Sequence, residues 1–299
     1  MLKIAYSPIY KYNLPEGHRF PMIKYELIPE QLLYEGTIEP DNFFSPYPIS
    51  EETLLSTHTA EYWKKLNQQL LSHKEIRKIG FPMSSQLIER GLHIAGGTIA
   101  CAKYALQHGV AMNIAGGTHH SYADHGEGFC IFNDIALAAN YLLRKGKAHS
   151  ILIVDLDVHQ GNGTARIFQN ESRVFTFSMH GARNYPAKKE RSDLDIGLRD
   201  GCGDDEYLKL LHKHLAEVID RHQPDFMFYL SGVDVLHSDK LGRLSLSLEG
   251  CKERDAIVLE SAYKRGIPMT ISMGGGYSEK IGTIVEAHAN TFRLASQLF

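Results

Sequence analysis

Short runs of apolar residues, rich in β-branched side chains, recur along the chain and predict buried strands. They lie at Leu2–Ser7, Val110–Ala115, Ser150–Leu156, Val174–Ser178, Phe226–Leu230 and Pro268–Met273. Longer segments with a helical period of apolar residues separate these runs. They lie at Glu51–Leu71, Ser84–Gln107, Asn133–Leu143, Thr164–Gln169, Asp204–His222, Leu248–Arg265 and Ser278–Leu298. Because strands alternate with helices, we expect a three-layer α/β/α protein with a mostly parallel central sheet.

Two stretches show no strong periodicity and are expected to be loops. They are Pro8–Tyr47, rich in proline and aromatic residues, and Gly181–Cys202, which is polar and basic. Long irregular segments in a compact domain more often carry function than simply connect elements. The chain shows no internal repeat and no change of composition that would mark a boundary, so we expect residues 1–299 to form a single domain.

The composition excludes several classes of function. Hydrophobic residues make up 43% of the 299 residues, which is ample for one large core. The net charge of −3 gives no electrostatic footprint for nucleic acid, and no apolar run reaches membrane-spanning length. No signal peptide is visible, and the four cysteines form no CxxC pair. These features predict a cytoplasmic protein with free thiols and no nucleic-acid or membrane partner.

The apolar run Ser150–Leu156 changes character at its end, where Asp155, Asp157 and His159 follow at a spacing of two. On an extended chain, side chains at this spacing point to one side. Two buried carboxylates and an imidazole on one face are unfavourable unless another group compensates their charge. A metal ion is the simplest compensation.

Other predicted strands also end in reactive side chains. His119 and His120 follow the strand that ends at Ala115, Asp234 follows the strand that ends at Leu230, and Tyr277 follows the last strand. Because parallel strands end at the same edge of a sheet, where ligands bind in open α/β proteins, we expect these groups to form one site.

Asp157, His159 and Asp234 would make a three-ligand site for Zn²⁺ with one position open for water. Oxygen-rich ligands also suit Fe²⁺ or Mn²⁺. Taken singly, each residue has a plainer explanation, as a capping acid or a structural histidine. Their convergence favours the metal, which would activate water and polarise a bound carbonyl.

The two adjacent histidines need partners that fix their tautomers. We expect Asp155 to pair with His119 and Asn162 with His120. An aspartate stabilises the imidazolium more than an asparagine does, so His120 is expected to be the better base near neutral pH. Tyr277, which follows three glycines, can donate a hydrogen bond to an oxyanion. The plainer alternatives are two surface histidines and a core tyrosine.

Five motifs then carry a resemblance to a known family. They are GGTHH (Gly116–His120), GFCIFND (Gly128–Asp134), VDLDVHQGNG (Val154–Gly163), SGVD (Ser231–Asp234) and GGGY (Gly274–Tyr277). In order and spacing the chain resembles the histone deacetylases, the zinc-dependent branch of the arginase–deacetylase fold. Its compact size and the sequence GHRFPM near the N-terminus look most like class IV and bacterial deacetylase-like members.

The resemblance implies a role for each matching residue. Asp157, His159 and Asp234 would bind zinc, and His120 would be the main general base and acid, assisted by His119. Tyr277 would stabilise the tetrahedral intermediate. The implied substrate tunnel is lined by Gly128, Phe129, Tyr185 and Gly275. A structural K⁺ is implied near Asp155, Asp157, His159, Ser178 and Met179. Arg19 matches, loosely, a residue beside an internal acetate channel.

The sequence departs from the family pattern at two positions. Asn162 stands where class I members have an aspartate, and Tyr185 stands where a phenylalanine is more usual. No residue matches the rim aspartate with which class I enzymes hold a peptide backbone. The expected substrate is therefore an acyl-lysine peptide or protein, or a small acylated amine.

These observations predict a zinc-dependent amide hydrolase that removes acetyl or longer acyl groups from lysine-like amines. One alternative is a two-metal Mn²⁺ ureohydrolase, but that chemistry needs an Asp-x-Asp pair, and Asp234 is followed by Val235 and Leu236. The other alternative is a catalytically silent module that binds acyl-lysine. The intact set of ligands, base and tyrosine favours the enzyme.

Overall fold

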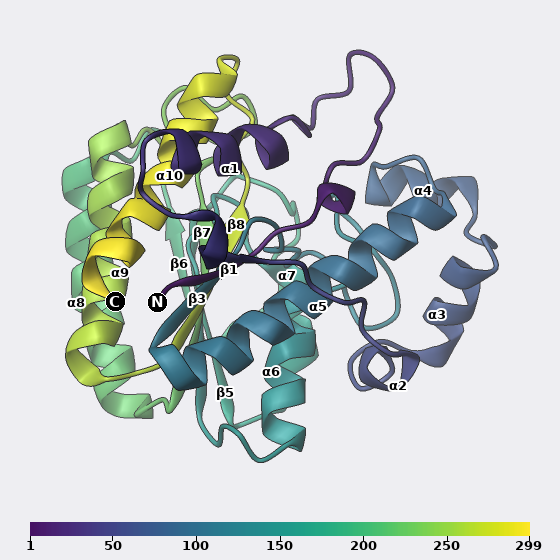
Figure 1. The fold of residues 1–299 in the computed structure, drawn as a ribbon, viewed down its shortest axis with the longest axis horizontal. Helices are drawn as coiled ribbons and strands as arrows, with labels where there is room; N and C mark the ends of the chain where they lie inside the picture. Colours follow the sequence, from purple (N-terminus) through teal and green to yellow (C-terminus); the bar gives the residue numbers. More distant parts are fainter.

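A single sheet of eight parallel strands forms the centre of the molecule (Figure 1). The structure is a computed structural model that describes residues 1–299. The strand order is β2-β1-β3-β8-β7-β4-β5-β6. The strands are β1 (Lys3–Ala5), β2 (Phe43–Phe44), β3 (Val110–Asn113), β4 (Ile151–Asp155), β5 (Val174–Gly181), β6 (Leu194–Leu198), β7 (Phe226–Gly232) and β8 (Met269–Gly274). The predicted α/β class with a parallel sheet is confirmed.

Ten α-helices surround the sheet. They are α1 (Lys24–Tyr34), α2 (Glu51–Leu54), α3 (Ala60–Asn67), α4 (His73–Ile79), α5 (Ser85–His108), α6 (Asp134–Arg144), α7 (Asn162–Phe168), α8 (Asp204–His222), α9 (Leu248–Arg265) and α10 (Ile281–Leu298). Short 3₁₀ turns lie at Pro8–Tyr10 and Pro40–Asn42. None of the helices combines the length and apolar character needed to cross a membrane.

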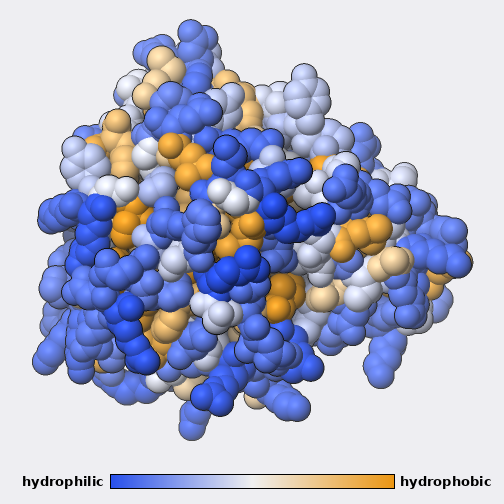
Figure 2. Space-filling model, turned by 90° about the horizontal axis from the view of Figure 1, so that it is seen from below, coloured by the Kyte–Doolittle hydropathy of each residue, from blue (hydrophilic) through white to orange (hydrophobic).

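The central strands are apolar on both sides because helices cover both faces. In β4, Ile151 and Ile153 pack with residues of α5 and α6, whereas Leu152 and Val154 belong to the larger core on the opposite face. Helices α8, α9 and α10 cover that second face (Figure 1). The surface seen in Figure 2 is mostly hydrophilic, with hydrophobic residues in small separate patches.

The helix boundaries follow from capping side chains. Ser84 Oγ accepts a hydrogen bond from Leu87 N at the start of α5, and Ser247 Oγ accepts one from Gly250 N at the start of α9. Such caps satisfy backbone donors that a helix start leaves free. The predicted bounds of α8 and α9 are confirmed, and the prediction for α5 differs by one residue at each end.

Three predictions of local structure were wrong. The stretch Pro8–Tyr47 contains α1, whose helical pattern is interrupted by Pro29 and which packs against α10. The stretch Gly181–Cys202 contains β6, a short edge strand whose residues alternate between exposed and partly or fully buried. The expected helix Glu51–Leu71 is broken into α2 and α3, because Thr59 caps a new helix start. Helix α1 and strand β6 form where the signal is short or interrupted and tertiary packing completes the element, whereas at Thr59 a local cap breaks a continuous helical signal.

The strand at the centre of the site ends earlier than its pattern suggests. β4 stops at Asp155, and the chain bends through residues 157–159. Asp155, Asp157 and His159 therefore do not lie on one extended strand, and the predicted alignment of their side chains by a spacing of two was wrong. Asp155 Oδ1 accepts a hydrogen bond from Asp157 N at 3.2 Å and so stabilises the bend.

Candidate active site

A cavity of about 560 Å³ opens at the carboxyl ends of the central strands. His119 and His120 reach it from the turn after β3, Asp157 and His159 from the bend after β4, and Tyr277 from the segment after β8. The structure thus brings together side chains that lie far apart in the sequence, at the sheet edge where the sequence places them.

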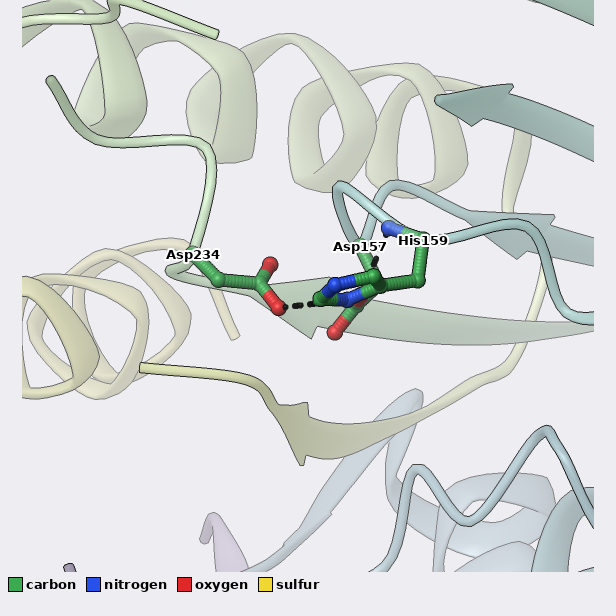
Figure 3. Close-up of side chains that lie close together, drawn as sticks. All are labelled: Asp157, His159 and Asp234. Atoms are coloured by element: carbon green, nitrogen blue, oxygen red, sulfur yellow. Dashed lines mark hydrogen bonds and ion pairs between the residues drawn. The ribbon is translucent and has the colours of Figure 1, made fainter. Parts of the chain in front are cut away.

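Asp157 and His159, together with Asp234 from the segment after β7, form a compact cluster that could hold a metal ion (Figure 3). The ligand atoms of Asp157, His159 and Asp234 all lie within 4.8 Å of one another. His159 Nδ1 lies 2.9 Å from Asp157 Oδ1 and 3.1 Å from Asp234 Oδ2. Both carboxylates are buried, and the histidine side chain is only 11% exposed.

The charges of this cluster are poorly compensated by the protein alone. Burial and the neighbouring Asp157 raise the pKa of Asp234 to about 7. Burial alone would lower the pKa of His159, but the adjacent carboxylates of Asp157 and Asp234 raise it to about 10. Asp234 Oδ1 accepts from Val158 N at 3.0 Å, whereas its buried Oδ2 makes no well-formed hydrogen bond. An orphaned carboxylate oxygen beside an imidazole fits a divalent cation.

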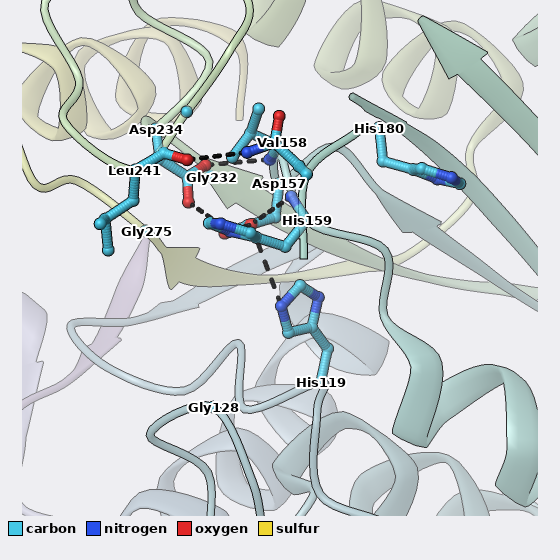
Figure 4. A network of polar contacts seen from close by, with 12 residues as sticks. His119, Gly128, Asp157, Val158, His159, His180, Gly232, Asp234, Leu241 and Gly275 are labelled. Atoms are coloured by element: carbon cyan, nitrogen blue, oxygen red, sulfur yellow. Dashed lines mark hydrogen bonds and ion pairs between the residues drawn. The ribbon is translucent and has the colours of Figure 1, made fainter. Parts of the chain in front are cut away.

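The two adjacent histidines have different partners. His119 Nδ1 lies 2.7 Å from Asp155 Oδ2, and His120 Nδ1 lies 2.6 Å from Asn162 Oδ1. Their ring centroids are 4.1 Å apart. His119 points toward the cluster of Asp157, His159 and Asp234, with Nε2 3.9 Å from Asp157 Oδ1 (Figure 4).

The partners push the two histidines in opposite directions. Burial lowers the pKa of both side chains, but for His119 the charge and hydrogen bond of Asp155 outweigh burial, so its pKa is raised. For His120 the neighbouring His119 and His159 add to the effect of burial, and its pKa lies well below the ordinary value. His120 is therefore neutral at pH 7 and can accept a proton.

Tyr277 is carried by a glycine turn at the end of β8. Gly275 and Gly276 have φ values of 56° and 90°, a backbone region that favours glycine. Tyr277 N donates to Asp239 Oδ2 at 2.6 Å, which fixes the turn. Burial and the charge of Asp234 raise the pKa of the Tyr277 phenol well above its usual value, so the hydroxyl keeps its proton. It can act as a hydrogen-bond donor.

Aromatic side chains form the wall of the cavity. The rings of Tyr185 and His120 are nearly perpendicular, with centroids 4.9 Å apart. Phe129 stands at a positive φ of 68° next to Gly128, and its centroid is 6.1 Å from that of Tyr277. Gly275 also lines the cavity.

The basic side chains that line the cavity include both exposed and buried residues. Arg19, which the resemblance places loosely beside an internal channel, is exposed and lies over the Phe129 ring at 5.0 Å. The buried cations are Lys24 and Arg90. Lys24 Nζ donates to Gly275 O at 2.5 Å, and burial lowers its pKa to about 8.

Of the positions implied for a structural K⁺, Asp157 and His159 belong to the candidate metal cluster and the others lie in β4 and β5. Asp155 of β4 pairs in register with Ser178 of β5, and Met179 follows in that strand. Ser178 Oγ lies 2.9 Å from His180 Nδ1. The potassium site stays a prediction.

Sequence reasoning missed Lys24, Asp239 and Glu127. Glu127 is only 3% exposed and lies directly before the GFCIFND motif. The one signal in the sequence that could have pointed to Glu127 is its place between two glycines, directly before the motif that resembles a tunnel lining.

Comparison with known proteins gives consistent matches over nearly the whole chain. Residues 18–292 match the family model of the histone deacetylase domain. The chain is 43% identical over 296 residues to an uncharacterised protein of Picosynechococcus sp., covering 99% of both chains. It is 29% identical to histone deacetylase 2 of Arabidopsis thaliana, covering 95% of this chain and 76% of the relative. The crystal structure of an HDAC homolog complexed with SAHA aligns with a TM-score of 0.85 at 25% identity, covering 100% of this chain and 84% of that one.

Proposed function

The chain belongs to the histone deacetylase family, and we propose that it is a zinc-dependent hydrolase that removes acetyl or longer acyl groups from lysine side chains. The observation that carries this proposal is the convergence of the Asp157–His159–Asp234 cluster, the two paired histidines and Tyr277 on one cavity. Each group has a distinct task in amide hydrolysis.

The metal would be held by Asp157, His159 and Asp234. Its fit rests on two buried carboxylates and an imidazole, and on Asp234 Oδ2, which makes no hydrogen bond and has only the His159 ring at 3.1 Å beside it. When bound, zinc supplies Lewis-acid polarisation of the carbonyl and lowers the pKa of water. A structural K⁺ beside Asp155, Ser178 and Met179 belongs to the same proposal.

The protein's own groups move the protons. With Nδ1 held by Asn162, His120 accepts a proton from the attacking water at Nε2 and returns it to the leaving amine. His119, whose charged form Asp155 favours, contributes positive charge next to the site. The Tyr277 hydroxyl donates a hydrogen bond to the oxyanion that forms at the carbonyl oxygen when water attacks the carbonyl carbon.

The cavity suits a long, apolar stem. Phe20, Phe81, Phe129 and Tyr185 all line it. Such a lining matches the methylene chain of lysine and leaves room for more than an acetyl group in about 560 Å³.

The charge of the cavity favours acyl-lysine in a peptide over an acylated polyamine. Exposed arginines line the cavity at Arg19, Arg77, Arg183 and Arg243. Asp200 offsets only part of this charge, through contacts of 3.8 Å with Arg183 and 3.2 Å with Arg243. A polyamine, which keeps positive charges after acylation at one end, would be repelled at this mouth.

The test is a hydrolysis panel with the zinc-loaded protein. Acetyl-, octanoyl- and myristoyl-lysine peptides and acetylated polyamines are compared, with and without a hydroxamate chelator. We expect chelator-sensitive cleavage of at least one lysine peptide, and slower or no turnover of polyamines. Turnover of polyamines alone would overturn the proposed substrate. Tight binding of acyl peptide without hydrolysis would support a silent binding module, and two metals per chain would support a ureohydrolase.

A further inference from the structure

Glu127 is a buried carboxylate for which the proposed mechanism has no task. It is 3% exposed and accepts hydrogen bonds from side chains of separate segments. Asn162 Nδ2 donates to its Oε1 at 2.6 Å, and the Tyr185 hydroxyl donates to the same oxygen at 2.7 Å. Lys78 forms an ion pair with Oε2. Glu127 therefore contacts three groups: Tyr185 of the tunnel wall, Asn162, which is the partner of His120, and the surface residue Lys78.

The contact with Asn162 decides which way that amide faces. A carboxylate can only accept hydrogen bonds, so the end of Asn162 that faces Glu127 must be the NH₂ group. The opposite end, Oδ1, then faces His120 Nδ1 at 2.6 Å. A carbonyl oxygen also only accepts, so His120 must carry its proton on Nδ1. This leaves Nε2 free to take a proton.

Without Glu127, the amide would keep only one acceptor for its NH₂ group. That acceptor is the Tyr122 hydroxyl at 3.0 Å, which donates its own proton to Glu190 Oε1 at 3.2 Å but, unlike a carboxylate, can rotate and donate to the amide instead. A rotated amide would present NH₂ to His120 and select the tautomer protonated at Nε2. That tautomer cannot accept a proton at the atom that the reaction uses.

The surroundings also keep Glu127 charged. Burial would raise its pKa, but His125, Lys78, Tyr185 and Asn162 hold the pKa of this carboxyl well below its usual range. The negative charge is one side chain removed from His120, whereas Asp155 touches His119 directly. It therefore supports the His120 imidazolium more weakly than a direct aspartate would.

We propose that Glu127 is a positioning residue that orients the Asn162 amide and thereby fixes the reactive tautomer of His120. The inference rests on the proposed role of His120 as the base. The chain thus replaces a direct histidine–aspartate pair by a three-residue relay, His120–Asn162–Glu127.

The first test reads the tautomer directly and needs no turnover. Long-range ¹H–¹⁵N spectra of ¹⁵N-histidine-labelled protein at neutral pH, with His120→Ala to assign the signal, show which nitrogen carries the proton. We expect Nδ1–H in the wild type and a substantial Nε2–H fraction in Glu127→Ala. An Nε2–H signal in the wild type, or an unchanged tautomer in Glu127→Ala, would overturn the proposal.

The second test uses rescue. Asn162→Asp supplies a carboxylate that accepts from His120 Nδ1 without needing orientation, so it should restore turnover to Glu127→Ala. We expect Glu127→Ala alone to lower kcat about 30-fold with little change in KM, and the double variant to recover about tenfold. A merely structural role would give no rescue, and that result would contradict the proposal.

Two further variants sharpen this test. Glu127→Gln keeps an oxygen that can accept from Asn162 but removes the charge, so we expect a kcat loss of only about threefold. Glu171→Gln removes an exposed carboxylate paired with Arg173, far from His120 in the sequence, and serves as the matched control with unchanged kcat. If the wild type hydrolyses no substrate, the proposed function fails, while the spectra still decide the role of Glu127.

Discussion

The neighbouring residues His119 and His120 share one turn and almost the same burial, at 4% and 5% exposure, yet they have opposite protonation preferences. Asp155 raises the pKa of His119, whereas the amide of Asn162 does not offset burial and the nearby histidines at His120. The difference teaches that the partner of a buried histidine, rather than burial itself, sets its chemistry. In the proposed mechanism His119 stays protonated and contributes positive charge, whereas His120 is neutral at rest and transfers the proton of the reaction.

The largest predicted effect comes from disrupting the proposed metal site, next to which both histidines lie. Asp234→Ala deletes one of the three ligands, so we expect loss of bound zinc and a fall in kcat of at least about 1000-fold. Metal analysis of the purified variant, alongside turnover of an acyl-lysine peptide, measures both. A variant that stays active without metal would show that neither histidine works with a metal site.

Tyr277→Phe should leave both histidine pairs intact. We expect kcat to fall about 100-fold, because the variant lacks the hydroxyl that donates to the oxyanion. The low-pH limb of the rate profile should not move, since His120 keeps its partner. A shifted limb with normal kcat at high pH would mean that Tyr277 acts through the histidines.

Asn162→Asp, combined with Glu127→Gln so that an amide rather than a second carboxylate faces the new aspartate, gives His120 the same kind of partner as His119 and should reduce the pKa difference between the two histidines. A carboxylate beside Nδ1 raises the pKa of His120, so the low-pH limb of kcat/KM should move upward by about one pH unit. The rate should therefore drop at pH 6 and remain near normal at pH 8. The test is the pH dependence of kcat/KM for the zinc-loaded proteins. If the low-pH limb does not move, a group other than His120 is responsible for it.

The smallest effect concerns stability. The pKa of His120 is lowered from 6.5, so protons bind preferentially to the unfolded chain as the pH falls below 6.5, and folding stability decreases. The raised pKa of His119 has the opposite sign, because it stabilises the fold below 6.5 and this stabilisation is lost as the pH rises through the raised value.

Relative to the wild type, His120→Asn should therefore lose less stability between pH 7 and pH 5, and His119→Asn should lose more. A tenfold difference in proton affinity between the folded and unfolded chain corresponds to about 1.4 kcal/mol. Urea unfolding of the metal-free proteins at the two pH values measures the free energy of unfolding of each variant. Equal losses in both variants would contradict the opposite pKa changes of the two histidines.

Most of the candidate site residues that follow the central strands could be predicted from the sequence. The apolar runs placed His119, His120, Asp234 and Tyr277 at one sheet edge because parallel strands end together. The same reasoning missed β6, whose alternation of Leu194, Ile196 and Leu198 spans only five residues within a polar segment, and α1, whose helical signal is broken by Pro29.

Residues whose role depends on distant partners could not be predicted from spacing. Glu127 meets Asn162 and Tyr185 from positions 35 and 58 residues away, and no periodicity encodes such contacts. Lys24 meets the carbonyl of Gly275 across 251 residues. Only the folded chain brings these groups together, since their contacts are set by packing and not by local preference.

The division of roles between the two histidines is tested by comparing kcat for His120→Ala and His119→Ala on the same acyl-lysine peptide, with zinc content verified in both. We expect a loss of about 1000-fold for His120→Ala, which lacks the base, and about tenfold for His119→Ala, which lacks only a nearby positive charge. Equal losses, or a larger loss for His119→Ala, would contradict the division of roles between the two histidines.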